Sequence, residues 1–310
     1  MAEFRPAIGD ETQFLEELLD HGLLLRAGAP GVYGRGPLFE DVLKRFDALV
    51  TRIAAPDHSE SLRFSPLMPR HHLEATGYLG SFPHLAGTIF AFEGSEGDAA
   101  EQAERAARHD DWSEYQSMTD LVLVPAACYP IYPAIAARGP LPTGGTTIDA
   151  GGAYVFRREP AGDPARLQMF HQREMVRIGE PETVAEWRDA WRDRAVNVLR
   201  RIGLDAQFAV ASDPFFGRSG RMLAANQRAQ ELKFEVTIPI ASPAPTAVAS
   251  FNYHQDHFVH SFGIELADGS VAHTACLGFG LERITLGLLR KHGLNPQRWP
   301  SDVRDELWSP

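Results

Sequence analysis

Apolar residues recur at helical spacing in three segments of the chain, which predicts amphipathic helices over residues 11–24, 39–53 and 281–291. Gly293 follows the last segment, where a glycine commonly ends a helix. We expect another helix at residues 183–202, which carry five arginines. The polar residues 98–117 predict a surface helix or an excursion from the body, and the glycine-rich and proline-containing residues 27–37 are typical of a loop.

Other segments alternate with the period of two that is typical of strands, at residues 154–159, 170–178 and 234–240. Residues 260–266 and 270–275 flank the turn dipeptide Asp268-Gly269, which predicts a β-hairpin. The apolar residues 121–133 contain three prolines and predict a buried strand that these prolines interrupt. Helices come first and strands follow with little helix between them, so we expect an α+β fold with a mostly antiparallel sheet.

The composition is that of an ordinary globular protein and limits the partners. The chain has 310 residues, of which 44% are apolar and 23% are charged, so wholesale disorder is excluded. Its formal net charge of -11 makes it a poor general binder of nucleic acid and of anionic membranes. The first residues are acidic where a signal peptide would be basic, and the uncharged, apolar residues 121–137 are too few to span a membrane. We expect a cytoplasmic protein.

Two cysteines, Cys128 and Cys276, form no disulfide framework, but with Glu174 they suggest a metal site. Glu174 shares a strand face with apolar residues, where a carboxylate needs a partner. Two thiolates and one carboxylate would give a three-ligand zinc site with an open fourth position. Spacing alone does not bring the three together, so two buried structural cysteines remain the alternative.

A second cluster of metal-binding residue types is His254, His257 and His260 with Asp256. Its spacing resembles that of ligands on one helix face. However, the segment runs into an apparent strand, because residues 259–266 alternate, and a strand would send the histidines to different faces. We therefore do not expect a metal there.

Two further motifs suit the binding of a polyanion. In the sequence FRRE, Arg157 and Glu159 are two residues apart and would share a face of a strand, although a surface ion pair is the simpler interpretation of this pair alone. In the sequence GFGLER, Gly278 and Gly280 allow backbone to approach a ligand, and Arg283 lies in the first turn of the predicted helix, where phosphates bind.

In this order, FRRE and GFGLER resemble motifs 2 and 3 of class II aminoacyl-tRNA synthetases, and the resemblance covers most of the chain. The sequences ELKFEVTIP and AVASFNY resemble seryl-tRNA synthetases, and HLEATGYLGSFPHLAG and FHQREMV resemble their atypical, zinc-containing branch found in methanogens. In that branch two cysteines and one glutamate bind zinc, which takes the amino group of the amino acid. The resemblance thus implies one zinc ion at Cys128, Glu174 and Cys276.

The long N-terminal arm with which seryl-tRNA synthetases hold tRNA is not matched, since no sustained heptads precede the SFPHLAG segment. This truncation resembles the amino acid:[carrier protein] ligases. These enzymes adenylate a small amino acid, typically glycine or alanine, and transfer it to the phosphopantetheine thiol of a small carrier protein. The resemblance implies a single synthetase-like domain over residues 1–310 that forms a homodimer and uses no tRNA.

The resemblance also implies residue roles. Arg157 would hold the ATP α-phosphate and the substrate carboxylate, Glu159 would contact adenine, and Arg166 and Arg283 would hold the terminal phosphates. The full set of implied ATP-binding residues is Arg157, Glu159, Arg166, Leu167, Val248, Ala249, Ser250, Phe251 and Arg283. Ala247 stands where seryl enzymes have a Mg²⁺-binding glutamate, so the ligands of the Mg²⁺ that accompanies ATP stay open, with Glu235 as a substitute.

Lys233 and Asn252 are candidate substrate residues, although Lys233 is about as well explained as a surface lysine that extends along apolar surface. For the carrier we expect docking at residues 183–202, with Trp187 and Trp191, or at residues 216–232. The alternative for both is a solvated helix face, with the tryptophans in the core.

Two other functions stay open: a seryl-tRNA synthetase with an unusual tRNA contact, and a retired synthetase-like regulatory subunit. The intact Arg157, Glu159 and Arg283 count against the regulatory subunit, because a retired site has no need of them.

Overall fold

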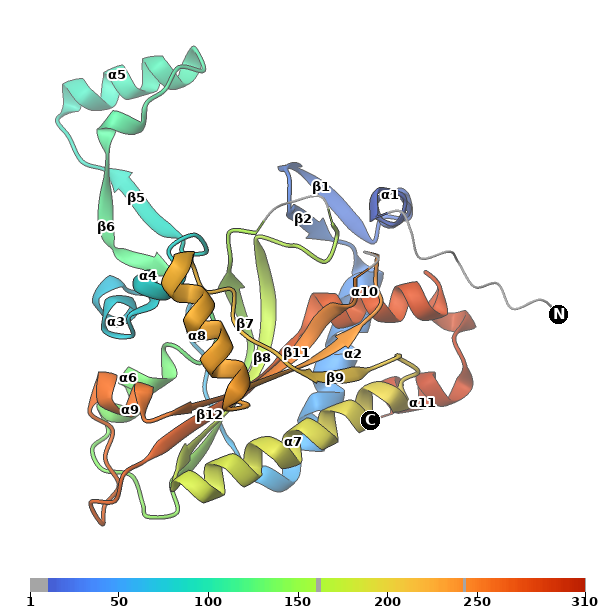
Figure 1. The fold of residues 1–310 in the computed structure, drawn as a ribbon. Helices are drawn as coiled ribbons and strands as arrows, with labels where there is room; N and C mark the ends of the chain where they lie inside the picture. The colour runs from blue at the N-terminus through green and yellow to red at the C-terminus, as the bar shows by residue number, and fades with distance from the viewer. Residues whose placement is uncertain (1–10, 160–162, 242–243, 310) are drawn as a thin grey trace.

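The computed structural model describes residues 11–159, 163–241 and 244–309, and within them a seven-stranded sheet forms the centre of the molecule (Figure 1). The spatial order is β3 (Glu60–Ser61), β7 (Thr146–Phe156), β8 (Met169–Gly179), β12 (His273–Gly280), β11 (Thr246–Gln255), β10 (Lys233–Ile238) and β9 (Gln207–Val210). Neighbouring strands are antiparallel, except that β3 and β7 are parallel. This sheet confirms the predicted α+β fold.

One face of the sheet is covered by α2 (Pro37–Ala54), α7 (Pro181–Arg201) and α10 (Leu281–His292), with α1 (Glu11–Asp20) and α11 (Ser301–Trp308) in the same core. α2 belongs here because its apolar stripe is buried, and Phe46 meets Phe279 of β12 edge-on at 5.7 Å between ring centroids. The helices predicted at 39–53, 183–202 and 281–291 are confirmed.

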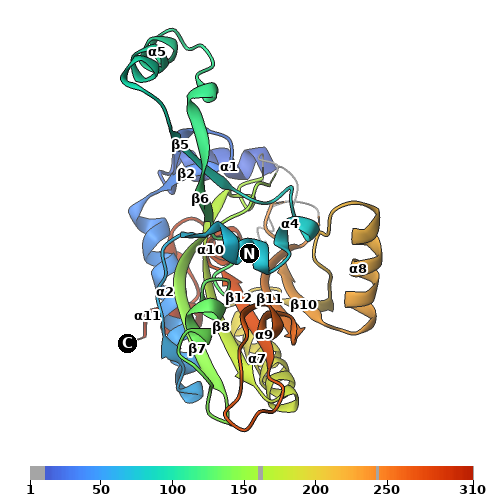
Figure 2. The same ribbon diagram turned by 90° about the vertical axis from the view of Figure 1, so that its left-hand side faces the viewer.

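The other face carries a second core under α3 (Arg70–Ala75), α4 (Tyr78–Ser81), α6 (Ile131–Ala136) and α9 (His257–Phe262). Strand alternation separates the two cores: Met175 and Leu277 belong to the first, whereas Val176 and Cys276 belong to the second. Glu174 shares the face of Val176, so a carboxyl group lies among the apolar residues of the second core. α8 (Gly217–Ala229) lies beside this face and buries only Gly220 (Figure 2).

An arm projects from the body (Figures 1 and 2). Its base is a three-stranded sheet in the order β4 (Leu67–Pro69), β6 (Gln116–Leu123) and β5 (Thr88–Phe92), and its tip is α5 (Glu96–Ala107). Ser95 and Asp98 form a reciprocal capping box that starts α5. The excursion predicted at 98–117 is thus confirmed, although the helix ends at Ala107 and a strand begins at Gln116.

The structure corrects the hairpin predicted at residues 260–266 and 270–275. His257–Phe262 form α9, and the ring of Phe258 stacks on Tyr132 at 4.1 Å between centroids, so packing overrides the alternating pattern. The dipeptide Asp268-Gly269 does form a turn, with Gly269 at a φ of 77°. β12 begins only at His273 and pairs with β8 and β11.

Smaller differences concern element ends. The predicted loop at 27–37 contains the hairpin of β1 (Leu24–Ala29) and β2 (Val32–Arg35), and α1 ends at Asp20, before β1. The strand expected at 154–159 ends at Phe156, and the apolar segment 121–133 holds the end of β6 and the start of α6. Single 3-10 turns occur at η1 (Ala55–Asp57), η2 (Ser113–Tyr115) and η3 (Pro296–Arg298).

Among the described residues, none of the helices is both long enough and apolar enough to cross a membrane.

Candidate active site and metal centre

A cavity of about 420 Å³ opens on the second face of the sheet. Its floor is formed by β8, β10, β11 and β12, and its walls by the loop before α6, by residues 213–215 and by α8 and α9. Charged and polar groups from distant parts of the sequence meet in it: Cys128, Arg157, Glu174, Lys233, Asn252, Cys276 and Arg283.

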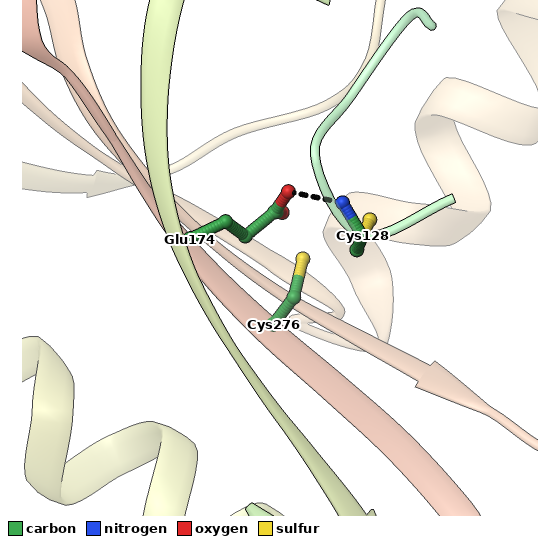
Figure 3. A group of neighbouring side chains, drawn as sticks. All are labelled: Cys128, Glu174 and Cys276. Carbon is green, nitrogen blue, oxygen red and sulfur yellow. Dashed lines mark hydrogen bonds between the residues drawn. The ribbon is translucent and has the colours of Figure 1, made fainter. Parts of the chain in front are cut away.

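The cysteine and glutamate residues that the sequence suggests as zinc ligands lie together in this cavity (Figure 3). Glu174 extends from β8, Cys276 from the adjacent β12 and Cys128 from the loop that precedes α6. One ligand atom from each lies within 4.8 Å of the others. The backbone N–H of Cys128 donates to Oε2 of Glu174 over 2.7 Å and orients the carboxyl group in the cluster.

Burial makes the charged forms of these groups unfavourable in the absence of a cation. Burial raises the pKa of Glu174, which is 1% exposed, and also that of the Cys128 thiol. The hydrogen bond with Cys128, together with burial, raises the pKa of Cys276 well above its usual range. A carboxyl group and two thiols at this depth fit a divalent ion that binds S and O donors, and three protein ligands leave a coordination position open.

Beside the three candidate zinc ligands Cys128, Glu174 and Cys276, called the ligand cluster below, the side chain of Gln172 packs closely against the backbone of β12. Gln172 of β8 accepts a hydrogen bond from the N–H of Ala127 over 3.1 Å, which fixes the loop that carries Cys128. A Cβ atom on Gly278 would lie 2.5 Å from Nε2 of this glutamine. A side chain at Gly278 would therefore displace the amide of Gln172 that holds this loop.

Arg283 and Glu159 form the centre of a second polar group. Arg283 donates to the carbonyl oxygens of Ala165 over 2.9 Å and Ala247 over 3.1 Å, so backbone holds the guanidinium in place. Glu159 accepts from Arg166 over 2.7 Å and from Arg283 over 3.5 Å. Burial opposes ionisation of Glu159, but Arg283, Arg166 and Arg157 outweigh it and lower its pKa.

The predicted strand face of Arg157 and Glu159 is corrected, because β7 ends at Phe156 and both residues follow the strand. Arg157 still reaches the cavity, and its Nε lies 3.4 Å from the carbonyl oxygen of Pro125. Glu159 reaches the polar group through its ion pairs rather than through strand alternation.

The remaining implied ATP residues divide into two groups. Val248, Ala249 and Ser250 of β11 line the cavity. Phe251 and Leu167 are buried, and the side chain of Phe251 belongs to the first core. Neither residue is part of the lining of the cavity that the described residues form.

Lys233 is 5% exposed and lines the cavity, so its interpretation as an extended surface lysine is wrong. Its Nζ lies 2.5 Å from Oδ1 of Asp213 and 3.1 Å from Oε1 of Glu235. Burial disfavours the ammonium form, but the two carboxylates outweigh burial and raise the pKa of Lys233. Gln227 of α8 donates to the other oxygen of Asp213 over 2.8 Å and so ties α8 to the cavity. Sequence reasoning missed Asp213.

The histidine cluster separates, but not as expected. His254 and His257 both line the cavity, whereas His260 is exposed and pairs with Asp256 over 3.0 Å. Burial lowers the pKa of His254 to about 3, so this imidazole is neutral. Among the described residues, Cys128, Glu174 and Cys276 make up the one group with metal-ligand geometry.

No protein-family model matches the chain. A curated relative, amino acid--[acyl-carrier-protein] ligase 1 of Bradyrhizobium diazoefficiens, is 44% identical over 303 residues, which cover 97% of this chain and 91% of the relative. The type-2 serine--tRNA ligase of Methanopyrus kandleri is 30% identical over 204 residues, which cover 60% of this chain and 37% of that protein.

Among solved structures, the seryl-tRNA synthetase of M. kandleri in complex with A. aeolicus tRNASec superposes with a TM-score of 0.80 at 21% identity. The match covers 97% of this chain and 62% of the solved chain, so this chain spans less than two thirds of that protein. Similarity at this level of identity establishes the fold, which is that of a class II synthetase catalytic domain.

Proposed function

Because the chain belongs to the amino acid--[acyl-carrier-protein] ligase family, we propose that it activates a small amino acid with ATP and transfers the aminoacyl group to the phosphopantetheine thiol of a carrier protein. Glycine is the first candidate substrate and alanine the second. The observation that carries this proposal is that one cavity holds both the Cys128–Glu174–Cys276 cluster and the cationic groups of Arg157 and Arg283.

In the activation step, a carboxylate oxygen of the amino acid attacks the α-phosphorus of ATP, and the bond to the β-phosphate oxygen breaks to release pyrophosphate. Arg157 offsets the negative charge that gathers on the α-phosphate and carboxylate, and Arg283 with Arg166 holds the terminal phosphates. Backbone carbonyls already fix Arg283, so little reorganisation is needed when ATP binds. Mg²⁺ accompanies ATP, and Glu235 is its candidate ligand, although it also pairs with Lys233.

The amino-acid substrate would bind at the end of the cavity that holds the ligand cluster. Cys128, Glu174 and Cys276 would hold one zinc ion, and the sulfur and oxygen donor set supports this assignment. When bound, zinc supplies a Lewis acid that selects a free α-amino group. The N–H of Cys128 keeps the Glu174 carboxylate oriented, and Lys233 and Asn252 line the same cavity as candidate substrate contacts.

In the transfer step, the carrier thiol attacks the carbonyl carbon of the aminoacyl adenylate, AMP leaves, and the thiol proton passes to solvent or to the phosphate. The docking surface we favour is α8, the helix within residues 216–232. Leu223 and Gln227 line the cavity, while Phe216 and Met222 are 56% and 76% exposed beside Arg218 and Arg221. Carrier proteins are usually acidic, which suits this basic and apolar surface.

In the other candidate docking segment, residues 183–202, the two tryptophans are not available for a partner. Trp191 is fully buried, Trp187 packs against the first core, and both donate to Asp57. The tryptophans of α7 therefore belong to the core, as the alternative interpretation expects, and are not available for docking.

We further propose that residues 1–310 act as one catalytic domain in a homodimer of the class II type, located in the cytoplasm, without tRNA or membrane as a partner. The acidic net charge of -11 supports the exclusion of nucleic acid and of anionic membranes as partners.

The test is an ATP–pyrophosphate exchange panel over amino acids, followed by mass spectrometry of the carrier. We expect exchange with glycine above alanine and serine, and one glycyl addition to the holo-carrier but none to the apo-carrier. Serine as the preferred substrate with efficient charging of tRNA would overturn the proposal in favour of a seryl-tRNA synthetase. Absence of exchange with any amino acid would favour a regulatory subunit.

A further inference from the structure

His254 lies next to the ligand cluster without belonging to it. It is in β11, and its Nε2 is 3.5 Å from Sγ of Cys276, within reach of an N–H···S hydrogen bond. The cluster in which all ligand atoms lie within 4.8 Å of one another comprises Cys128, Glu174 and Cys276. His254 is thus a neighbour of one ligand and has a single ring nitrogen directed at its sulfur.

The other ring nitrogen faces hydroxyl groups. Nδ1 of His254 is 3.1 Å from Oγ1 of Thr274 and 3.5 Å from the hydroxyl of Tyr132. Thr274 is fully buried, so its hydroxyl proton needs an acceptor inside the protein. Phe258 contacts the imidazole edge-on at 4.8 Å between centroids and stacks on Tyr132, which holds the ring in this orientation.

The sulfur atom on one side and the two hydroxyl groups on the other favour the tautomer that carries its proton on Nε2. A neutral imidazole has one N–H donor and one acceptor, and a hydroxyl that donates to Nδ1 leaves the proton on Nε2. Cys276 as a metal-bound thiolate is an acceptor only. The opposite tautomer would direct a nitrogen lone pair at a negatively charged sulfur, which is repulsive.

We propose that His254 is a positioning residue of the metal centre, which donates a hydrogen bond from Nε2 to the thiolate of Cys276. This inference rests on the proposed zinc site. Asn252 provides a second donor, since its Nδ2 is also 3.5 Å from Sγ of Cys276. Two N–H donors draw electron density from the sulfur and hold it in one orientation, so the ion remains a stronger Lewis acid for the substrate amino group.

The chain provides a graded set of variants for the test. His254→Phe keeps the ring volume but removes both nitrogens, whereas His254→Gln retains an N–H donor of similar reach. His257→Phe is the matched control, because His257 also lines the cavity but contacts the carbonyl oxygen of Thr76 at 3.1 Å rather than a ligand.

Zinc affinity is measured by competition with a chelator. Loss of an outer hydrogen-bond partner typically weakens metal binding about 10–100-fold, and we expect this loss for His254→Phe. His254→Gln should stay within a few-fold of the wild type, and His257→Phe should match it. A His254→Phe protein that binds zinc as tightly as the wild type would overturn the inference.

Two spectroscopic readouts do not depend on catalysis. In the Co²⁺-substituted protein, loss of a donor to the thiolate should shift the sulfur-to-cobalt charge-transfer band of His254→Phe but not that of His257→Phe. In the ¹⁵N-histidine spectrum of the zinc-loaded wild type, His254 should carry its proton on Nε2, and a proton on Nδ1 would refute the inference even if the variants failed to fold.

The same measurements separate this inference from the proposed function. If Cys276→Ser loses zinc while His254→Phe keeps full affinity and an unchanged cobalt spectrum, the zinc site stands and the role of His254 is wrong. If the wild type binds no zinc, the proposed zinc site and the proposed role of His254 are both wrong.

Discussion

Glu174 illustrates at the scale of single residues how burial creates a binding site. Strand alternation places its carboxyl group among apolar neighbours, and its one hydrogen-bond donor from the backbone, the N–H of Cys128, does not replace the lost water. Two thiols complete a pocket that is better satisfied by a cation than by protons.

The first prediction concerns the cysteines. Cys128→Ser and Cys276→Ser should each lose the zinc ion and amino-acid activation, because a serine hydroxyl is a poor zinc ligand, while the fold stays largely intact. Metal content, pyrophosphate exchange and circular dichroism measure the three effects. Full exchange activity in metal-free wild-type protein would contradict the prediction.

The second prediction concerns protons. The pKa values of the Cys128 and Cys276 thiols are raised above their usual range, so both thiols of the metal-free site hold their protons at neutral pH, and zinc must displace about one from each. Zinc affinity should therefore rise with pH and fall as the solution becomes more acidic. Proton release on zinc addition to weakly buffered protein measures the stoichiometry, and binding without release would show that the thiols are already ionised.

The third prediction concerns the arginines. Arg157→Ala and Arg283→Ala should each reduce the rate of pyrophosphate exchange by about 100-fold or more, the usual scale for loss of a preorganised charged contact. Arg158→Ala is the matched control, because Arg158 follows Arg157 directly but is exposed. An equal loss in the control would attribute the effect to the local backbone rather than to charge in the cavity.

At the scale of elements, α8 differs from the core helices α2, α7 and α10 because it buries only Gly220 and is held by a few specific contacts. Gln227 binds Asp213, and the N–H of Phe216 donates to the carbonyl oxygen of Ser81 over 2.9 Å. A helix with so little buried surface leaves most of its side chains free for a partner.

The fourth prediction follows from this exposure. Reversing both charges with Arg218→Glu and Arg221→Glu should slow aminoacyl transfer to the carrier at least several-fold, because an acidic surface repels an acidic partner, while pyrophosphate exchange stays unchanged. Arg201→Glu on α7 is the control for the other candidate segment. A larger effect of that variant on transfer would move the docking surface to α7.

α9 shows why local pattern was insufficient at this scale. Residues 259–266 alternate, yet Phe258 and Val259 are buried by α6 and the second core, and this packing stabilises a helix. The sequence argument also did not predict that His254, which belongs to β11, faces Cys276.

At the scale of the whole molecule, the ligand cluster connects parts that are far apart in the sequence. Cys276 and Glu174 lie on neighbouring central strands, and Cys128 joins the loop before α6 to them. A bound ion would therefore cross-link the sheet to the second core. Ligands that bind only the folded state stabilise it by mass action.

The fifth prediction is that removal of zinc lowers the melting temperature. At free zinc of about 100 times Kd the stabilisation is about 2.7 kcal/mol, and a chelator should remove it, with a fall of several degrees. The Cys276→Ser protein is the control and should not respond to the chelator. A similar fall in that variant would mean that the chelator acts elsewhere.

Local sequence patterns were enough to identify the residue types of the site and much of the scaffold. Alternation placed Glu174 on an apolar face, the GFGLER motif located Arg283 at the start of a helix, and helical periodicity located α2 and α10, because these features depend on neighbours within a few residues. The resemblance to class II synthetases then indicated which distant residues belong together.

The way in which these residues meet depends on the packing of the whole fold. Cys128 and Cys276 are brought together by β12 lying beside β8 and by the Gln172 contact that fixes the loop of Cys128. Lys233 is buried because Asp213 and Glu235 offset the cost of its desolvation. Such long-range contacts depend on the whole packed arrangement, and no local pattern encodes them.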